Sequence, residues 1–245
     1  MSFVDSPVKS YSETRKRTSD SYVKFSDKEK IVLRILDDHA KTVWKHWVAE
    51  ANGGKGLMAV CPNTATLKVC PIDLALQGLA KDDPKVLERR AKVRFMINVL
   101  DRTPVTQCTT CETVTTGKVC KNCGADVKKN EFVPLNKVKI LEGGPRLFRE
   151  TLAGIETLQM EEFEKDITEY DITFSTQGNG RDRKIAAVPQ SPEPLNEKWL
   201  LDPATGEKQS VFDLDLLSEP TPTEEIKLMM EGATMDELNE LRGIV

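Results

Sequence analysis

Alternating apolar and polar positions predict a chain made mainly of short strands. The segments IVLRILDD (31–38) and TVWKHWVAE (42–50) alternate in this way and are rich in β-branched and aromatic residues. Residues 37–40 form the expected turn between them. Further strand patterns occur at LMAVC (57–61), VRFMINVLDR (93–102) and VKILEG (138–143), and as two strands around a glycine turn in residues 170–189.

Three segments show helical spacing and interrupt the strands. Residues 70–92 are helical in character but break at Asp82–Pro84, where Asp83 can cap a second helix that begins at Pro84. Residues 144–158 repeat apolar residues at helical spacing, and residues 224–241 predict a short helix interrupted at Gly232. Mixed strands with few helices favour a β-rich α+β fold, specifically a small, partly open Greek-key barrel.

Composition divides the chain into an arm, a core and a tail. Residues 1–21 are polar and Ser-rich, which is typical of a flexible arm. We expect the folded core in residues 22–192, with an insertion at 103–133. The proline-marked stretch QSPEPLNE then predicts a linker, and residues 193–245 an acidic tail with a short helix.

The net charge of −4 conceals a gradient along the chain. Residues 1–103 carry 19 Lys/Arg against 13 Asp/Glu, residues 104–195 carry 12 against 14, and residues 196–245 carry 4 against 12. A basic front and an acidic end suggest a polyanion-binding body with an anionic appendage. Uneven but ordinary surface charge is the alternative.

The segment CTTCETVTTGKVCKNCG (108–124) predicts a metal site. Its C-x2-C-x8-C-x2-C spacing lets four thiolates close around one Zn²⁺, each at about 2.3 Å. The ligands would be Cys108, Cys111, Cys120 and Cys123. Four such ligands leave no open position, so we expect one structural zinc ion in a ribbon that stiffens an insertion between neighbouring strands. Unrelated core thiols or a redox pair are the alternative.

A second donor set is less regular. His46, Cys61, Cys70 and Asp73 give H-x14-C-x8-C-x2-D, in which every residue type can bind zinc. A carboxylate is unusual in a structural zinc site, and buried free cysteines with a strand histidine would explain the same residues.

Motifs of catalysis and targeting are absent from the sequence. It contains no Walker-type loop, H-E-x-x-H, G-x-S-x-G or G-x-G-x-x-G, and only two histidines. We therefore expect a protein that is not an enzyme. The N-terminus lacks the apolar stretch of a signal peptide and no apolar run could span a bilayer, so we expect a cytoplasmic protein without membrane contact.

Basic and aromatic residues in the strands predict a groove for single-stranded nucleic acid. Such grooves combine cations for the phosphates with rings on which bases stack. In WKHW, Trp44 and Trp47 point to opposite faces, so one should be buried and the other available. The predicted contacts are Arg34, Trp44, Lys45, Trp47, Arg89, Arg90, Lys92, Arg94, Phe95, Lys137, Lys139, Arg181, Arg183 and Lys184, with Tyr22 as a further ring.

The order of these motifs resembles the T4-type phage single-stranded DNA-binding (helix-destabilising) proteins. WKHWVAE, C-P-N, C-P-I-D, FMINVLD, VKILEGGPRLF and DITFSTQGNGRDRKIAAVP follow one another as in that family over about residues 22–192. The resemblance implies an OB-fold core with a zinc subdomain, and a protein that coats and protects single strands in replication, recombination and repair. It also implies a basic arm for cooperative self-association and an acidic tail that recruits replication or recombination proteins.

Carried onto this chain, the family's motifs give further expectations. Its self-association motif matches Arg15, Lys16, Arg17, Thr18 and Ser19. Its zinc ligands fall on His46, Cys61 and Cys70, but Asp73 replaces the last cysteine. Either Asp73 is a ligand or this site has lost its metal to the cysteine ribbon, and we favour the second. For the host of a phage protein, the compartment would be the bacterial cytoplasm.

Two uses are open for the acidic end of the chain. Residues 196–245 could swing freely, compete with DNA for the basic groove and present a helix to partner proteins. Alternatively, that helix packs on its own core. A different class of function, a zinc-ribbon adaptor that binds a transcription or replication protein, also fits the ribbon and the overall acidity.

Overall fold

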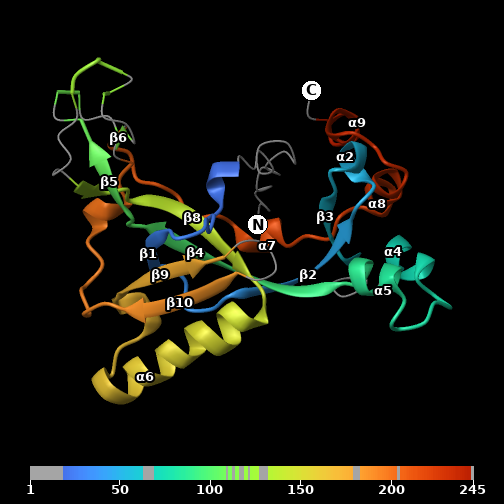
Figure 1. Ribbon diagram of the computed structural model, residues 1–245, viewed down its shortest axis with the longest axis horizontal. Coiled ribbons are helices and arrows are strands. Elements are labelled where there is room, and N and C mark those ends of the chain that lie inside the picture. Colours follow the sequence, from blue (N-terminus) through green and yellow to red (C-terminus); the bar gives the residue numbers. More distant parts are fainter. Residues whose placement is uncertain are drawn as a thin grey trace, which may run out of the picture. The chain divides into compact units, whose positions relative to one another are not determined.

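The computed structural model describes residues 19–62, 69–108, 110–111, 114–115, 119–120, 122–126, 132–178, 183–202 and 205–243 (Figure 1). Its strands are β1 (Lys30–Ile35), β2 (Lys41–Val48), β3 (Leu57–Val60), β4 (Lys92–Asp101), β5 (Pro104–Gln107), β6 (Val114–Thr115), β7 (Phe132–Pro134), β8 (Lys137–Gly143), β9 (Asp171–Gln177) and β10 (Lys184–Pro189). Its α-helices are α2 (Ala51–Gly54), α4 (Pro71–Ala75), α5 (Pro84–Arg89), α6 (Ala153–Phe163), α7 (Leu214–Leu217), α8 (Thr223–Met230) and α9 (Met235–Leu241). Its 3-10 and π-helical segments are η1 (Ser19–Ser21), η2 (Arg146–Leu152), η3 (Ile167–Glu169) and η5 (Glu197–Leu200).

The predicted strands and helices are confirmed at most positions. The expected strands are present as β1, β2, β3, β4, β8, β9 and β10. The two helices expected in residues 70–92 are present as α4 and α5. Asp83 caps α5 as predicted, because its side chain accepts a hydrogen bond from the Lys85 N–H at 2.8 Å. The helix expected near the C-terminus is present as α8 and α9, which meet at Gly232.

The chain forms two compact units, each assembled from separate segments. Unit 1 contains residues 41–95 and 213–245, and unit 2 contains residues 20–40 and 96–212. The predicted core of residues 22–192 therefore contributes to both units, and so does the predicted tail. Residues 1–18 of the predicted arm lie outside the described residues.

Unit 2 contains an open antiparallel sheet. Its strands follow the order β10-β9-β1-β4, with β8 also pairing with β4, and the registers include Leu33 opposite Ile172 and Leu33 opposite Asp101. Among the described strands, β10 pairs only with β9, so the sheet keeps a free edge. The fold is thus mixed α/β with a mostly antiparallel sheet. The expected small barrel is not confirmed, because the sheet does not close.

A small separate sheet interrupts the sequence between β4 and β8. Its order is β6-β5-β7, and all its pairings are antiparallel. It carries the predicted metal segment, so the expected insertion between two neighbouring strands is confirmed. After β8 the chain continues into η2, a π-helical turn, and α6. None of the helices in the described part of the chain is long and apolar enough to cross a membrane.

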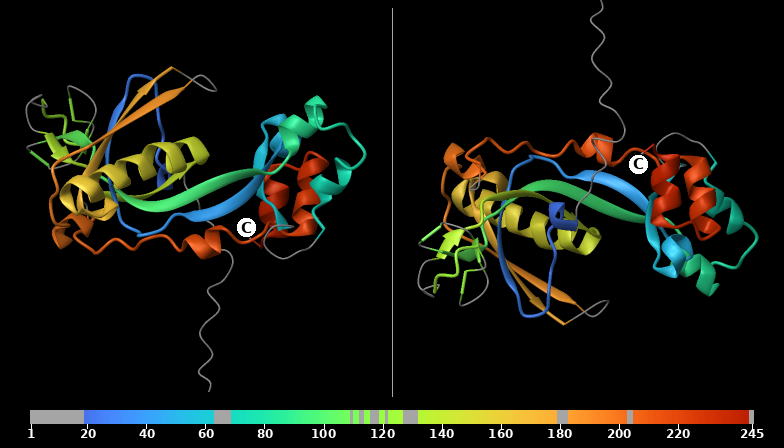
Figure 2. Two further views of the ribbon diagram at one scale, coloured as in Figure 1. Left: turned by 90° about the horizontal axis from the view of Figure 1, so that it is seen from below. Right: turned by 90° about the horizontal axis from the view of Figure 1, so that it is seen from above.

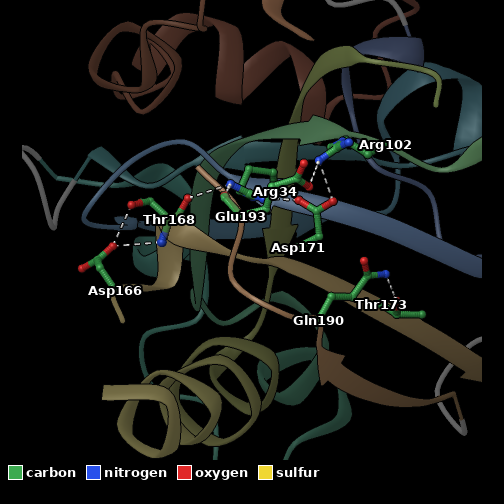
Figure 3. Close-up of polar contacts among 8 residues, drawn as sticks. All are labelled: Arg34, Arg102, Asp166, Thr168, Asp171, Thr173, Gln190 and Glu193. Atoms are coloured by element: carbon green, nitrogen blue, oxygen red, sulfur yellow. Dashed lines mark hydrogen bonds and ion pairs between the residues drawn. The ribbon is translucent and has the colours of Figure 1, made fainter. Parts of the chain in front are cut away.

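A buried arginine organises the interior of unit 2 (Figure 3). Arg34 in β1 is fully buried, and its Nε donates to Asp171 Oδ1 at 2.6 Å. Its Nη1 also donates to the carbonyl oxygens of Glu193 and Thr168, at 2.8 and 3.4 Å. Arg102 binds the other Asp171 oxygen at 2.9 Å. Arg34 was predicted to contact DNA, but this burial gives it a structural role instead.

The segment after β10 is held along unit 2 by specific contacts. The Gln209 side chain accepts from the Val138 N–H at 2.9 Å, and the Asn98 side chain binds both backbone groups of Phe212. Trp199 lies under the Arg102 guanidinium, 3.5 Å from ring centre to Cζ. Residues 190–212, which we name the strap, are therefore not the freely swinging linker predicted from QSPEPLNE.

The C-terminal helices complete the core of unit 1 (Figure 2). Figure 2 shows α8 and α9 beside α2 and α4, and Ile226, Met229 and Leu238 are buried among residues of β2, β3 and α4. For these three residues the alternative expectation applies: they pack inside unit 1 and are not available to a partner protein. Most acidic residues of the two helices (Glu224, Asp236, Glu237 and Glu240) are exposed, whereas Glu225 is buried.

We predict that Arg34→Met lowers the free energy of unfolding of unit 2 by about 3–5 kcal/mol, because it leaves Asp171 without its closest cation and orphans two carbonyl oxygens. Lys184→Met, at an exposed position of β10, is the control and should change stability by less than about 0.5 kcal/mol. Urea unfolding followed by hydrogen exchange of β1 and β9 measures both. Equal stability of the two variants would show that the buried ion pair is dispensable.

Candidate metal centres

The four ribbon cysteines come together in unit 2. Their sulfur atoms all lie within 4.8 Å of one another. Cys108 and Cys123 are 3.6 Å apart between sulfurs, and Cys111 and Cys120 are 3.5 Å apart. Four sulfurs around a tetrahedral zinc ion would be separated by about 3.8 Å. The predicted grouping is therefore present, and its geometry is compatible with one metal ion.

Local turns place these sulfurs. The N–H of Gly124 donates to the Cys120 carbonyl, and the N–H of Cys120 donates to the Ala125 carbonyl, each at 2.9 Å. Gly124 has a φ of 75°, a left-handed conformation that glycine adopts without steric cost. The second Cys-x-x-Cys pair therefore sits on a closed turn, as its sequence predicts.

The surroundings shift the pKa values of the Cys108 and Cys123 thiols in opposite directions. Backbone N–H groups of Cys111 and Thr110 lower the pKa of Cys108. The N–H of Ala125 acts in the same direction on Cys123, but the nearby sulfur of Cys111, burial and the sulfurs of Cys108 and Cys120 raise its pKa to about 12. Four thiolates at this spacing repel one another, and a divalent cation would remove that repulsion. The donor set thus fits a Zn²⁺ ion.

The second donor set is also assembled, within unit 1. His46 lies in β2, Cys61 follows β3, and Cys70 and Asp73 lie at the start of α4. Their ligand atoms are all within 4.8 Å of one another. Cys70 Sγ is 3.5 Å from His46 Nε2, and Asp73 oxygens are 3.7 Å from His46 Nε2 and from Cys61 Sγ. Tetrahedral zinc would separate such donors by about 3.4–3.6 Å.

The imidazole of His46 is oriented as a metal ligand requires. It is fully buried, and its Nδ1 lies 2.6 Å from the Arg89 carbonyl oxygen, to which it donates. The second nitrogen, Nε2, then faces the other three donors. A backbone carbonyl that fixes the far nitrogen is the usual outer partner of a metal-bound histidine.

Charge in this cluster favours a thiolate. Burial lowers the pKa of His46, but hydrogen bonds to Cys61 and to the Arg89 carbonyl, with the charges of Cys61 and Asp73, raise it overall. A hydrogen bond from Cys61, opposed by burial and helped by backbone N–H groups at the start of α4, lowers the pKa of Cys70 to about 7. The sequence favoured loss of metal here, whereas the structure brings all four donors together, Asp73 included.

The predicted nucleic-acid contacts divide by exposure. Both tryptophans of β2 are exposed, Trp44 by 41% and Trp47 by 37%, so the expectation that one is buried is wrong. Arg90, Lys92, Lys137 and Lys184 are also exposed. These six residues remain candidates for contacts with a ligand.

Other predicted contacts are engaged within the protein. Lys45 and Phe95 are buried, like Arg34. Arg89 binds Glu50, and Lys139 binds Asp101 at 2.7 Å. The remaining predictions are Arg94 and Arg183, which are half-buried; Ser19, which begins η1; and Arg15, Lys16, Arg17, Thr18 and Arg181, which lie outside the described residues.

Sequence reasoning missed a groove in unit 2. It has a volume of about 430 Å³ and is lined by Asp20, Tyr22, Val23, Lys24, Ser26, Glu29, Ile31, Asp101, Thr103, Val105, Leu135, Lys137 and Lys139. Three lysines and one tyrosine line it, but so do three carboxylates. Lys137, Lys139 and Tyr22 were predicted as separate contacts, yet only the fold brings them to one place.

No protein-family model matches the chain, and no curated protein matches it.

We predict that Cys120→Ser removes one zinc ion per chain and loosens the β5–β6–β7 sheet, because three ligands hold the ion far more weakly than four. The open sheet of unit 2 should stay folded, since the described ribbon strands pair with one another in a separate sheet. Elemental analysis and the absorption of the Co²⁺-loaded protein measure metal loss, and hydrogen exchange measures the sheet. Unchanged metal content would refute the ribbon site.

Proposed function

We propose that the protein binds single-stranded DNA with little sequence preference and performs no catalysis. The observation that carries this proposal is the pair of exposed tryptophans in β2, Trp44 and Trp47. Tryptophan is usually largely buried, and two exposed indoles in one strand suggest a surface that contacts a ligand. Exposed Arg90 and Lys92 in the same unit supply cations for phosphates.

The setting of Trp47 supports a stacking role. Gly56 lies beneath its ring, and a Cβ at Gly56 would come within 2.0 Å of the indole. The inner face of the ring is thus fixed against backbone while more than a third of the side chain remains open. A ring held in this way loses little freedom on binding, and stacking of one base contributes about 1–3 kcal/mol.

The groove of unit 2 offers a second contact region. Lys24 and Lys137 contribute positive charge there, and Tyr22 contributes a ring. Its carboxylates make the groove less cationic than the exposed face around Lys92, so we place it second. Phosphate contacts release counterions, so binding should weaken steeply as salt rises.

The finer parts of the proposal derive from the family resemblance. These parts are an OB-fold ancestry, a phage origin, cooperative coating through residues 15–19, and recruitment of replication or recombination proteins. A protein that prefers single strands destabilises duplexes by mass action. The zinc-ribbon adaptor is the competing proposal, and it requires no affinity for DNA.

The test is a titration with poly-dT followed by tryptophan fluorescence at several salt concentrations. We expect quenching, and a loss of affinity as salt rises. Absence of binding at low salt would reject the proposal and favour the adaptor.

We predict that Trp44→Ala or Trp47→Ala weakens binding about 5- to 150-fold, the equivalent of one stacked base. The two variants are tested separately, because residues an odd number of positions apart in a strand point to opposite faces. Leu79→Ala, which removes an equally exposed apolar side chain from unit 1, is the control and should leave affinity unchanged. Two tryptophan variants with wild-type affinity would contradict the stacking role.

A further inference from the structure

The second donor set and the C-terminal helices share one core. Cys61 and Cys70, each 1% exposed, belong to the same buried cluster as Ile226, Met229 and Leu238. The cluster also includes Val48, Ala51, Ala59 and Ile72. The side chains that would hold a metal ion are therefore also part of the surface on which α8 and α9 pack.

Backbone contacts fasten the C-terminal segment next to the same ligands. Thr221 forms a two-way link with Val60, because its N–H donates to the Val60 carbonyl at 3.1 Å and its hydroxyl accepts from the Val60 N–H at 2.9 Å. Val60 directly precedes the ligand Cys61. The N–H of Asn52 donates to the Ala233 carbonyl at 2.7 Å. Displacement of Cys61 would disturb the first of these links.

The C-terminal segment is strongly acidic, which adds charge repulsion that its apolar and backbone contacts must offset. Residues 213–243 contain nine Asp/Glu and two Lys/Arg. Glu225 is 1% exposed, and the Arg242 that pairs with it is a cation of the same segment. Three fully buried side chains anchor α8 and α9, with Leu228, Met230, Ala233 and Met235 packed more loosely against the same cluster, and Cys61 and Cys70 are part of the surface that these anchors meet.

We propose that a zinc-class ion bound by His46, Cys61, Cys70 and Asp73 locks residues 213–243 onto unit 1, and that loss of the ion releases this acidic segment. With the ion bound, the donors converge, and Cys61, Cys70 and Ile72 form a fixed surface for α8. Without it, the carboxylate, thiols and imidazole repel or rehydrate, and the surface is no longer held. This inference does not depend on nucleic-acid binding.

Thermodynamic linkage makes the coupling reciprocal. If the ion strengthens docking of the helices, docked helices must strengthen binding of the ion by the same factor. A variant of the helices that touches no ligand should therefore weaken metal binding. A purely local metal site would show no such effect.

The first experiment measures hydrogen exchange of the zinc-loaded full-length chain, with metal content determined in parallel. Asp73→Ala removes the most exposed ligand, with 37% of its side chain accessible, and should lose one ion and reduce protection of α8 and α9 at least tenfold. Cys120→Ser, the matched control in the ribbon, should also lose one ion but leave α8 and α9 protected. Unchanged protection of α8 and α9 after Asp73→Ala, or retention of both ions, would overturn the proposal.

The second experiment tests the coupling in both directions, with one variant that changes the metal site and one that changes the helices. Asp73→Cys supplies a better zinc ligand and should slow exchange in α8 and α9. Leu238→Ala removes an apolar anchor and no ligand, and it should lower the affinity of the unit 1 site, read from the thiolate-to-Co²⁺ absorption in competition with a chelator. Wild-type metal affinity in Leu238→Ala would show that site and helices are independent.

Discussion

Ionisable groups inside each unit must be neutralised, and this constraint determines where the last quarter of the chain lies. An unpaired charge in a protein interior costs several kcal/mol, so each buried group needs partners of matching charge or polarity. In unit 2 the group is the Arg34 guanidinium. In unit 1 it is the donor set around His46. Both recruit segments that are distant in sequence.

The two solutions differ in chemistry. Unit 2 neutralises Arg34 with a carboxylate of β9 and with carbonyl oxygens, one of which belongs to Glu193 at the start of the strap. These partners are all protein atoms, although the buried Nη2 of Arg34 itself has no hydrogen-bond partner among the described residues. Unit 1 instead gathers an imidazole, two cysteine sulfurs and a carboxylate, whose ligand atoms all lie within 4.8 Å of one another. A metal ion bound there would neutralise these groups, and the stability of unit 1 would then depend on the supply of that ion.

Local signals in the sequence predicted local structure well. Period-two alternation located the main strands, Asp83 and Pro84 marked the start of α5, and cysteine spacing located the ribbon site. Each of these features depends on neighbours within about ten residues. The His46 set was visible only as an irregular spacing, because its members are brought together by the pairing of β2 with β3 and by α4.

Long-range features could not be predicted. Arg34 occupies a strand position that looked solvent-facing, and its burial depends on Asp171, 137 residues away. The closure of the sheet depends on which edge strands pair, and no local pattern encodes that. In the C-terminal segment, acidic residues dominate the composition, so composition did not indicate that Ile226 and Leu238 are completely buried.

The interleaved composition of the units has a consequence for biosynthesis. Residues 41–95 leave the ribosome well before residues 213–243, yet the two segments form one unit. Until the final residues emerge, the thiols of Cys61 and Cys70 lack the apolar cover that Leu238 helps to provide. Such non-local closure slows folding. Before α8 and α9 have been synthesised, Cys61 and Cys70 therefore lack the cover of these helices and are open to oxidation. If translation stops early, the two cysteines stay uncovered.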